Sequence, residues 1–198
     1  MITADPLTAG APVRAAGAAA REHGATVWLT GLPSAGKTTL ARAVAERLAA
    51  TGRRVEVLDG DEIRRYLSQE LGFSRADRHT NVLRIGFVAE LLASHGVLVL
   101  APVIAPYADS REAVRKRHEA NGTTYLEVHV ATPVEVCSVR DVKGLYARQA
   151  AGELTGLTGV DDPYEEPTAP ELRIRTEGRP VADTAAGLHR FLVERGLA

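Results

Sequence analysis

Residues 31–38, with the sequence GLPSAGKT, have the types and spacing of a phosphate-binding loop. They fit the pattern G-x-x-x-x-G-K-[ST], in which the glycines let successive backbone N–H groups gather around phosphate oxygens. Lys37 can neutralise β- and γ-phosphates, and the Thr38 hydroxyl can ligate Mg²⁺. An apolar run (ATVWLT) precedes the motif and a helical pattern follows it, as this loop requires. The motif predicts binding of ATP or GTP and leaves the phosphoryl acceptor open.

Two carboxylates, Asp59 and Asp61, directly follow a second apolar run. In a parallel sheet this position lies beside the phosphate loop. One carboxylate can orient the waters of Mg²⁺, and the other can accept the proton of the acceptor's hydroxyl. The alternative is a turn in which Asp61 caps the following helix, because Asp is a favoured N-cap residue. The two roles are compatible.

Arg78, Asn81 and Arg84 recur at i, i+3 and i+6, which predicts one polar stripe along a helix. Two guanidiniums and an amide suit a multiply charged oxyanion, because Arg forks match phosphate-like oxygens. Arg64 could join them, and Phe73 could stack on a base. The alternative is a solvated helix face with a local ion pair of the Asp77–Arg84 type, and the spacing alone favours this alternative.

The segment 141–165 is long, punctuated by glycines and mixed in charge. Loops of this length in a compact domain are usually functional or disordered. A mobile cationic lid would shield phosphoryl transfer from water. The alternative is a plain surface loop whose charges are solvated.

Apolar and helical patterns alternate along the chain from residue 25. This alternation predicts an α/β protein with three layers, in which helices cover both faces of a mainly parallel sheet. Ligands of such sheets bind beyond the carboxyl ends of the strands, where the motifs above fall. Strands are expected at 25–30, 54–58, 97–104, 125–130 and 172–175, and helices at 37–50, 61–71, 75–95, 109–120, 133–139, 144–151 and 181–194.

The composition bounds the class of protein. The chain has 198 residues and a net charge of −1, which argues against a nucleic-acid binder with a basic face and against a polybasic membrane anchor. No run is long and apolar enough for a bilayer. The lone Cys137 cannot form an internal disulfide, so nothing calls for an oxidising compartment. We expect a flexible N-terminal extension at 1–24, one domain at 25–198, and a cytoplasmic protein.

Six segments, in order, resemble the adenylylsulfate kinase (APS kinase) family over about residues 25–175: GLPSAGKTTLA, LDGDEIRRYL, LGFSRADRHTNVLRIG, VIAPY, EVCSVRDVKGLY and GLTGVDDPYEEP. Members of this family phosphorylate adenylylsulfate to 3′-phosphoadenylylsulfate in sulfate assimilation. The resemblance implies a P-loop kinase fold, a homodimer, and ATP with Mg²⁺. It leaves open an association with the sulfate adenylyltransferase of the same pathway.

The resemblance also implies roles for single residues. Asp61 would be the catalytic base near the ribose 3′-hydroxyl, and Lys37 would act on the transferred phosphate. The ATP-binding residues would be Gly31, Ser34, Ala35, Gly36, Lys37, Thr38 (also the Mg²⁺ ligand), Thr39 and Arg140, the last of them over the adenine. Adenylylsulfate would be bound by Asp59, Asp61, Arg64, Phe73, Arg78, Asn81, Ile104, Lys143, Leu145 and Leu157, with Phe73 stacked on its adenine.

The chain departs from the family pattern at several positions. Leu157 stands where the family often has Phe, so one face of the acceptor's adenine would meet an aliphatic side chain. Ala105 stands where many members have a serine linked to a phosphoenzyme, so we expect direct in-line transfer without phosphoserine. Ala131 replaces an acidic residue. Two other functions remain open: a kinase of another small-molecule alcohol, and a non-catalytic nucleotide-binding regulatory module. Release of ADP on addition of adenylylsulfate would distinguish them.

Overall fold

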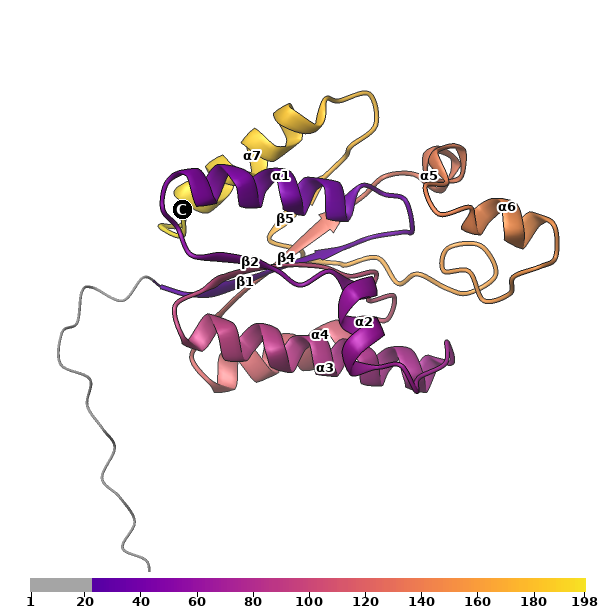
Figure 1. Ribbon diagram of the computed structural model, residues 1–198, viewed down its shortest axis with the longest axis horizontal. Coiled ribbons are helices and arrows are strands. Elements are labelled where there is room, and N and C mark those ends of the chain that lie inside the picture. The colour runs from indigo at the N-terminus through magenta and orange to yellow at the C-terminus, as the bar shows by residue number, and fades with distance from the viewer. Residues whose placement is uncertain (1–22) are drawn as a thin grey trace, which may run out of the picture.

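The computed structural model describes residues 23–198, so most of the expected extension at 1–24 lies outside the described residues. Five strands form one sheet in the order β2-β3-β1-β4-β5 (Figure 1). All four pairings are parallel, which confirms the expected sheet. The strands are β1 (Ala25–Thr30), β2 (Val55–Val57), β3 (Leu98–Pro102), β4 (Thr124–Val130) and β5 (Leu172–Ile174).

Helices cover both faces of this sheet. They are α1 (Lys37–Ala50), α2 (Gly60–Leu67), α3 (Arg75–Ser94), α4 (Ala108–Ala120), α5 (Val134–Arg140), α6 (Leu145–Ala150) and α7 (Val181–Val193). Figure 1 shows α1 and α7 together on one face and α3 and α4 together on the other. The short helices α5 and α6 project beyond one end of the sheet.

The two faces of β1 build two separate cores. Val27 and Leu29 point to the side of α1 and α7 and belong to one buried apolar cluster. Trp28, between them, belongs to a second cluster with Ile85 of α3 and Val99 of β3. A central strand that is buried on both faces must be apolar or have its polar groups satisfied. The two threonines of ATVWLT meet this condition, because Thr26 Oγ1 lies 2.9 Å from His118 Nε2 and Thr30 Oγ1 donates to the Ile104 carbonyl oxygen.

The helix expected at 61–71 begins at Gly60 and ends at Leu67. Side chains take carbonyl oxygens that a longer helix would use. Arg84 Nη1 donates to the Leu67 carbonyl at 2.6 Å, and Gln69 Nε2 donates to the Arg65 carbonyl. Side chains therefore satisfy this helix end in place of a further helical turn.

The carboxyl ends of all five strands lie at one edge of the sheet, since the strands are parallel. The phosphate loop follows β1, Asp59 follows β2, and residues 103–107, 131–133 and 175–180 follow β3, β4 and β5. Parallel sheets bind ligands at this edge. Within residues 23–198, no helix has the length and apolarity that a membrane span requires.

Candidate active site

The loop from Gly31 to Thr38 connects β1 to α1 and depends on its two glycines. A Cβ at Gly31 would lie 2.5 Å from the carbonyl oxygen of Val130, so no other residue fits without moving β4. Gly36 has a φ of 97° and directly precedes α1. This left-handed conformation is costly for residues with a side chain. The loop thus leads straight into a helix N-terminus, which attracts phosphate.

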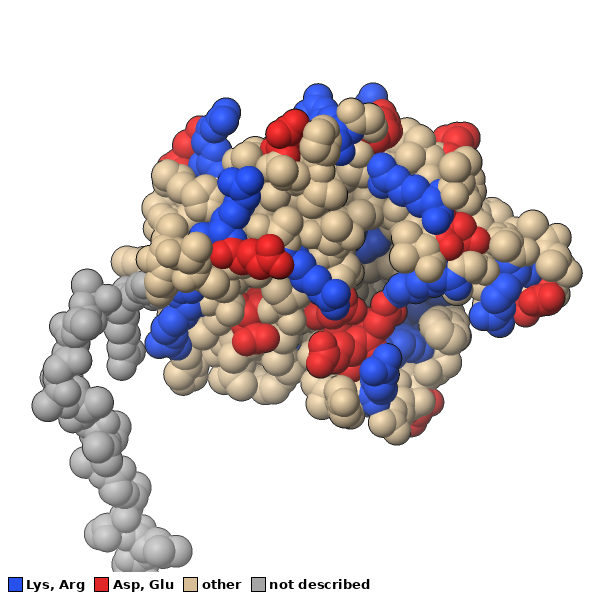
Figure 2. Space-filling view, turned by 45° about the horizontal axis from the view of Figure 1, so that its top comes forward, with Lys and Arg blue, Asp and Glu red and all other residues tan. Residues whose placement is uncertain are grey.

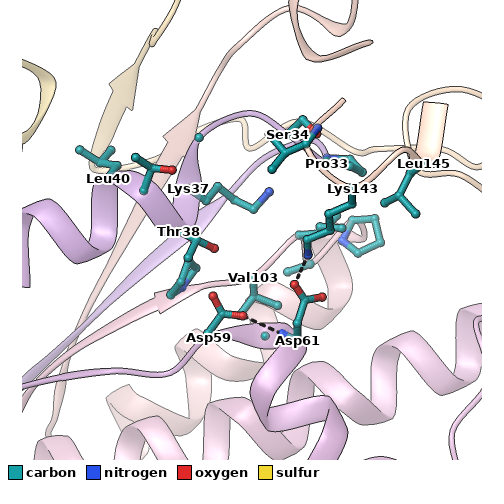
Figure 3. A pocket seen from close by; sticks show the side chains of 18 of the residues that line it. Pro33, Ser34, Lys37, Thr38, Leu40, Asp59, Asp61, Val103, Lys143 and Leu145 are labelled. Carbon is teal, nitrogen blue, oxygen red and sulfur yellow. Dashed lines mark hydrogen bonds and ion pairs between the residues drawn. The ribbon is translucent and has the colours of Figure 1, made fainter. Parts of the chain in front are cut away.

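The side chain of Lys37 lies over the loop and points into the cavity (Figure 3). Its Nζ donates to the carbonyl oxygens of Gly31 at 2.8 Å and Leu32 at 2.7 Å. Burial lowers the pKa of Lys37 from 10.5 to about 8. The ammonium therefore sits where it lacks a strong anionic partner, and a phosphate group would supply one.

This pKa predicts proton uptake when ATP binds above neutral pH. Near pH 8.5 a large fraction of the ligand-free chain carries neutral Lys37, and phosphate favours the charged form. Binding should then take up a proton, and ATP affinity should fall as the pH rises above about 8. Calorimetry at pH 8.5 in two buffers of different ionisation enthalpy measures the uptake. Lys37→Arg is the control because Arg stays protonated. Equal uptake in both proteins, or none in the wild type, would contradict the assignment.

Asp59 and Asp61 divide the two roles expected of them. Asp59 is the N-cap of α2, and its Oδ1 accepts from the Asp61 backbone N–H at 3.0 Å. The alternative in which Asp61 caps this helix is therefore wrong. The Asp61 carboxylate instead points into the cavity and pairs with the ammonium of Lys143 (Figure 3). Asp59 also lines the cavity.

Two guanidiniums converge on the ring of Phe73. The guanidinium carbon of Arg64 lies 4.4 Å from the ring centroid and that of Arg78 lies 5.7 Å from it. Burial, followed by the charge of Arg78, lowers the pKa of Arg64. The Asn81 amide lines the same wall, and its buried Oδ1 has no hydrogen-bond partner among residues 23–198. Such a wall fits an anion that carries an aromatic group and a hydrogen-bond donor.

The polar stripe expected on α3 does not remain together. Arg78 and Asn81 line the cavity, whereas Arg84 bonds to the carbonyl oxygen of Leu67 and to the Glu70 carboxylate. For Arg84 the structure agrees with the alternative in that the side chain forms an ion pair away from the cavity, but its partner is Glu70 and not Asp77. The helical spacing predicted that the three side chains lie on one stripe of α3. The turn after α2 places Glu70 beside Arg84, at the end of this stripe.

The expected lid, 141–165, has two parts. Residues 156–165 are fastened to the body of the protein: Arg78 donates to the Gly156 carbonyl oxygen at 2.6 Å and to Thr158 Oγ1 at 2.8 Å. Tyr164 Oη lies 2.9 Å from Thr30 Oγ1 on β1. Residues 141–150 contain α6 and carry Lys143 over the cavity (Figure 3). If the segment moves as a lid, residues 141–150 have fewer hydrogen bonds to the body of the protein to break than residues 156–165.

Leu157 lies within residues 156–165, the part that is bonded to the body of the protein, and is only 4% exposed. It packs in the core cluster that includes α1 and α7 and does not line the cavity. The structure thus does not bring Leu157 to the acceptor wall. Its neighbour Gly159 packs against Leu32, since a Cβ at Gly159 would lie 2.4 Å from Leu32 Cδ2.

Arg140 lines the cavity and bonds to the segment after β5. Its Nη1 donates to Thr176 Oγ1 at 2.8 Å, and its Nη2 donates to the Thr176 carbonyl oxygen at 3.1 Å. Sequence reasoning missed this wall, to which Thr176, Arg179, Val181 and Thr184 contribute. Thr176 and Arg179 follow the carboxyl end of β5, which was the available signal, and Val181 and Thr184 lie in the first turn of α7.

One cavity of about 640 Å³ joins these parts. The residues expected in the site that line it are Ser34, Gly36, Lys37, Thr38, Thr39, Asp59, Asp61, Arg64, Phe73, Arg78, Asn81, Ile104, Arg140, Lys143 and Leu145. Those that do not line it are Gly31, Ala35 and Leu157.

The walls of this cavity are strongly positive. Six of its lining side chains are Lys or Arg, and two are Asp. Figure 2 shows the hollow from outside, with a basic side chain at its floor and acidic and basic side chains meeting at its mouth. The imbalance favours polyanionic ligands, such as nucleotides, over neutral ones.

Comparisons with known proteins point to one family. The family described as adenylylsulphate kinase matches residues 23–175. An adenylyl-sulfate kinase of Myxococcus xanthus is 52% identical over 172 residues, covering 87% of this chain and 91% of the relative. One from a Picosynechococcus strain is 49% identical over 176 residues, covering 88% and 97%. A Mycobacterium tuberculosis APS kinase, solved in complex with AMPPNP and APS, superposes with a TM-score of 0.84 at 44% identity, covering 87% of this chain and 99% of that one.

Proposed function

The chain belongs to the adenylylsulphate kinase family, and from this premise we infer its reaction: ATP and adenylylsulfate give ADP and 3′-phosphoadenylylsulfate. One observation carries this inference most directly. A single cavity joins Lys37 and Thr38 of the phosphate loop to Asp61 and to the cluster of Arg64, Phe73 and Arg78. The terminal phosphate of one nucleotide and the ribose of a second can therefore face each other across Asp61.

We propose that the acceptor binds by the charge and shape of the Phe73 wall. The adenine would stack on Phe73, which is 68% exposed in the ligand-free structure. Arg64 and Arg78 would bind the phosphosulfate, and Asn81 Oδ1 would accept from a donor of the nucleotide. Ile104 and Leu145 would close the apolar sides. Arg78 already lies 3.9 Å from the Asp162 carboxylate, but a neutral alcohol would leave the Arg64 guanidinium without an anion, which disfavours the other small-molecule kinases.

Transfer would then proceed in line. As the ribose 3′-oxygen attacks the γ-phosphorus, a new O–P bond forms and the bond from that phosphorus to the β–γ bridging oxygen breaks. The electron pair leaves with ADP, and the proton of the hydroxyl passes to the Asp61 carboxylate. Lys37 and the N–H groups at the start of α1 would stabilise the charge that spreads over the phosphoryl oxygens. Lys143 must leave Asp61 for this step, and the anionic acceptor offers it another partner.

The residues present fit Mg²⁺ carried in with ATP. Thr38 and Asp59 both line the cavity beside the phosphate loop (Figure 3). No group of three or more His, Cys, Asp or Glu side chains among residues 23–198 could hold a metal alone, and Mg²⁺ in kinases usually keeps waters and phosphate oxygens as ligands. Bound there, the ion would neutralise part of the phosphate charge. Thr38 would ligate it, and Asp59 would orient its waters.

We propose direct transfer without a phosphoserine. Ala105 lines the cavity and is 1% exposed. Its methyl group offers no oxygen to phosphorylate. The intact phosphate loop and the cavity-facing Asp61 also favour a catalyst over a regulatory module that only binds nucleotides.

Identification of the product tests the function. With γ-labelled ATP and Mg²⁺, the label should move to the 3′-position of adenylylsulfate, with release of one ADP per product formed. Competing small alcohols at equal concentration should remain unlabelled, and no label should stay on the protein. Label on an alcohol without the adenylyl group would refute the proposed acceptor, and label on a side chain would refute direct transfer.

We propose a homodimer that works in the cytoplasm, where its donor ATP is abundant. Leu83, Phe87 and Leu91 recur every four residues on the outer side of α3 and are 37–48% exposed. A second copy of the chain could cover this stripe. Phe87→Glu should then shift the sedimenting species to the mass of one chain.

A further inference from the structure

The oxygen atoms of Thr176 join three parts of the site that are far apart in the chain. Thr176 Oγ1 donates to the carbonyl oxygen of Ala35, inside the phosphate loop, at 3.0 Å. The same oxygen accepts from Arg140 Nη1, and the Thr176 carbonyl oxygen accepts from Arg140 Nη2. Thr176 Oγ1 also lies 2.8 Å from Thr132 Oγ1, which itself donates to the Ala35 carbonyl oxygen at 2.9 Å.

These bonds fix the guanidinium of Arg140 before any nucleotide binds. Two N–H groups on one edge of the plane are held by one residue, while both flat faces stay available for stacking. Arg140 is otherwise an exposed side chain, and ordering a long exposed side chain costs conformational entropy. Fixing it in advance moves that cost from nucleotide binding to folding.

The second set of bonds fixes the phosphate loop. A carbonyl oxygen accepts up to two hydrogen bonds, and Ala35 has a hydroxyl donor from each of two threonines. Gly36 follows in the left-handed conformation and lies beneath Thr176, because a Cβ there would be 3.5 Å from Thr176 Oγ1. The threonine pair thus sets the orientation of the peptide that precedes the N–H groups of α1.

We propose that Thr176 is a positioning residue for ATP binding. It holds Arg140 against the phosphate loop, so that the adenine-binding and phosphate-binding ends of the ATP site are fixed relative to each other. The inference rests on the proposed function only in taking Arg140 as a contact of the adenine. Thr176 itself acts through Arg140 and Ala35 and takes no part in the transfer.

The test compares Thr176→Val with Thr176→Ser, since valine keeps the shape and serine keeps the hydroxyl. We expect Thr176→Val to raise the KM for ATP about tenfold, the effect of losing hydrogen bonds to a charged group, while the KM for adenylylsulfate and kcat at saturating ATP stay within about twofold. Thr176→Ser should restore the ATP value. A merely structural role would lower the melting temperature and raise both KM values in parallel, which would overturn the proposal.

A double-mutant cycle tests the route through Arg140. In an Arg140→Ala background, Thr176→Val should change ATP affinity by less than about twofold. Thr132→Val is the matched control, because Thr132 bonds to Ala35 without touching Arg140, so its effect should be the same in either background. A full tenfold effect of Thr176→Val without Arg140 would refute the coupling.

Equilibrium binding of ATP, measured without any acceptor, gives these affinities independently of turnover. A failure to phosphorylate adenylylsulfate with these couplings intact would refute the proposed acceptor and leave the role of Thr176 standing. Normal turnover of adenylylsulfate in the absence of these couplings would refute the role of Thr176 and leave the proposed acceptor standing.

Discussion

Asp61→Asn is expected to lower kcat for transfer to adenylylsulfate by about 10²–10⁴-fold, the usual contribution of a positioned general base. The amide keeps the size of the side chain and cannot take the proton of the 3′-hydroxyl. The side chain is 64% exposed and is not the cap of α2, so fold and ATP binding should be retained. Steady-state kinetics with both substrates measures the loss.

Two controls separate proton transfer from the loss of the ion pair with Lys143. Lys143→Met breaks the same pair and leaves the carboxylate in place. It should raise the KM for adenylylsulfate and lower kcat much less than Asp61→Asn does. Glu46→Gln removes an exposed carboxylate on the outer side of α1 and should change neither constant. Near-normal kcat in Asp61→Asn would exclude Asp61 as the base.

Lys37→Met should lower kcat by about 10³-fold, since we propose that Lys37 is the cation that reaches the β- and γ-phosphates from the loop. Methionine preserves the length and most of the volume of the chain, and it removes a charge that is unfavourably buried. The pKa of Lys37 falls to about 8, so the charged form costs about 3 kcal/mol in the ligand-free protein. The melting temperature should therefore stay equal or rise while activity collapses.

This opposition between stability and activity is the sharpest part of the prediction. If Lys37 served mainly to stabilise the fold, Lys37→Met would instead lower the melting temperature, and activity would be lost in proportion. Lys116→Met is the comparison, because Lys116 is exposed and, within residues 23–198, pairs only with Glu112 one turn away. It should alter neither kcat nor the melting temperature by much. Substantial turnover by Lys37→Met would remove the proposed stabilisation of the transferred phosphate.

The sequence predicted the local parts of the site well. The phosphate loop and the start of α1 at Lys37 follow from glycines and a lysine within eight residues. The parallel sheet follows from the alternation of strands and helices, and its carboxyl edge explains why Lys37 and Asp61 share a cavity. Each of these features depends on backbone preferences and on the periodicity of the sequence, and both are set by residues close together in the chain.

Contacts between distant segments could not be predicted in this way. The backbone of Asp61, not its side chain, meets the capping carboxylate of Asp59, and Arg84 turns to Glu70 instead of the cavity. Leu157, expected against the acceptor, is buried in the core. Thr176 reaches Ala35 across 141 residues.

The sequence by itself determined the family, the fold and the residues that can do chemistry on a phosphate, because short motifs and periodic patterns encode local conformation. Only the tertiary structure decided which of these side chains face the cavity and which are used elsewhere. Every guanidinium and carboxylate has several partners within reach, and the choice among them depends on which segments pack together once the chain has closed its long loops.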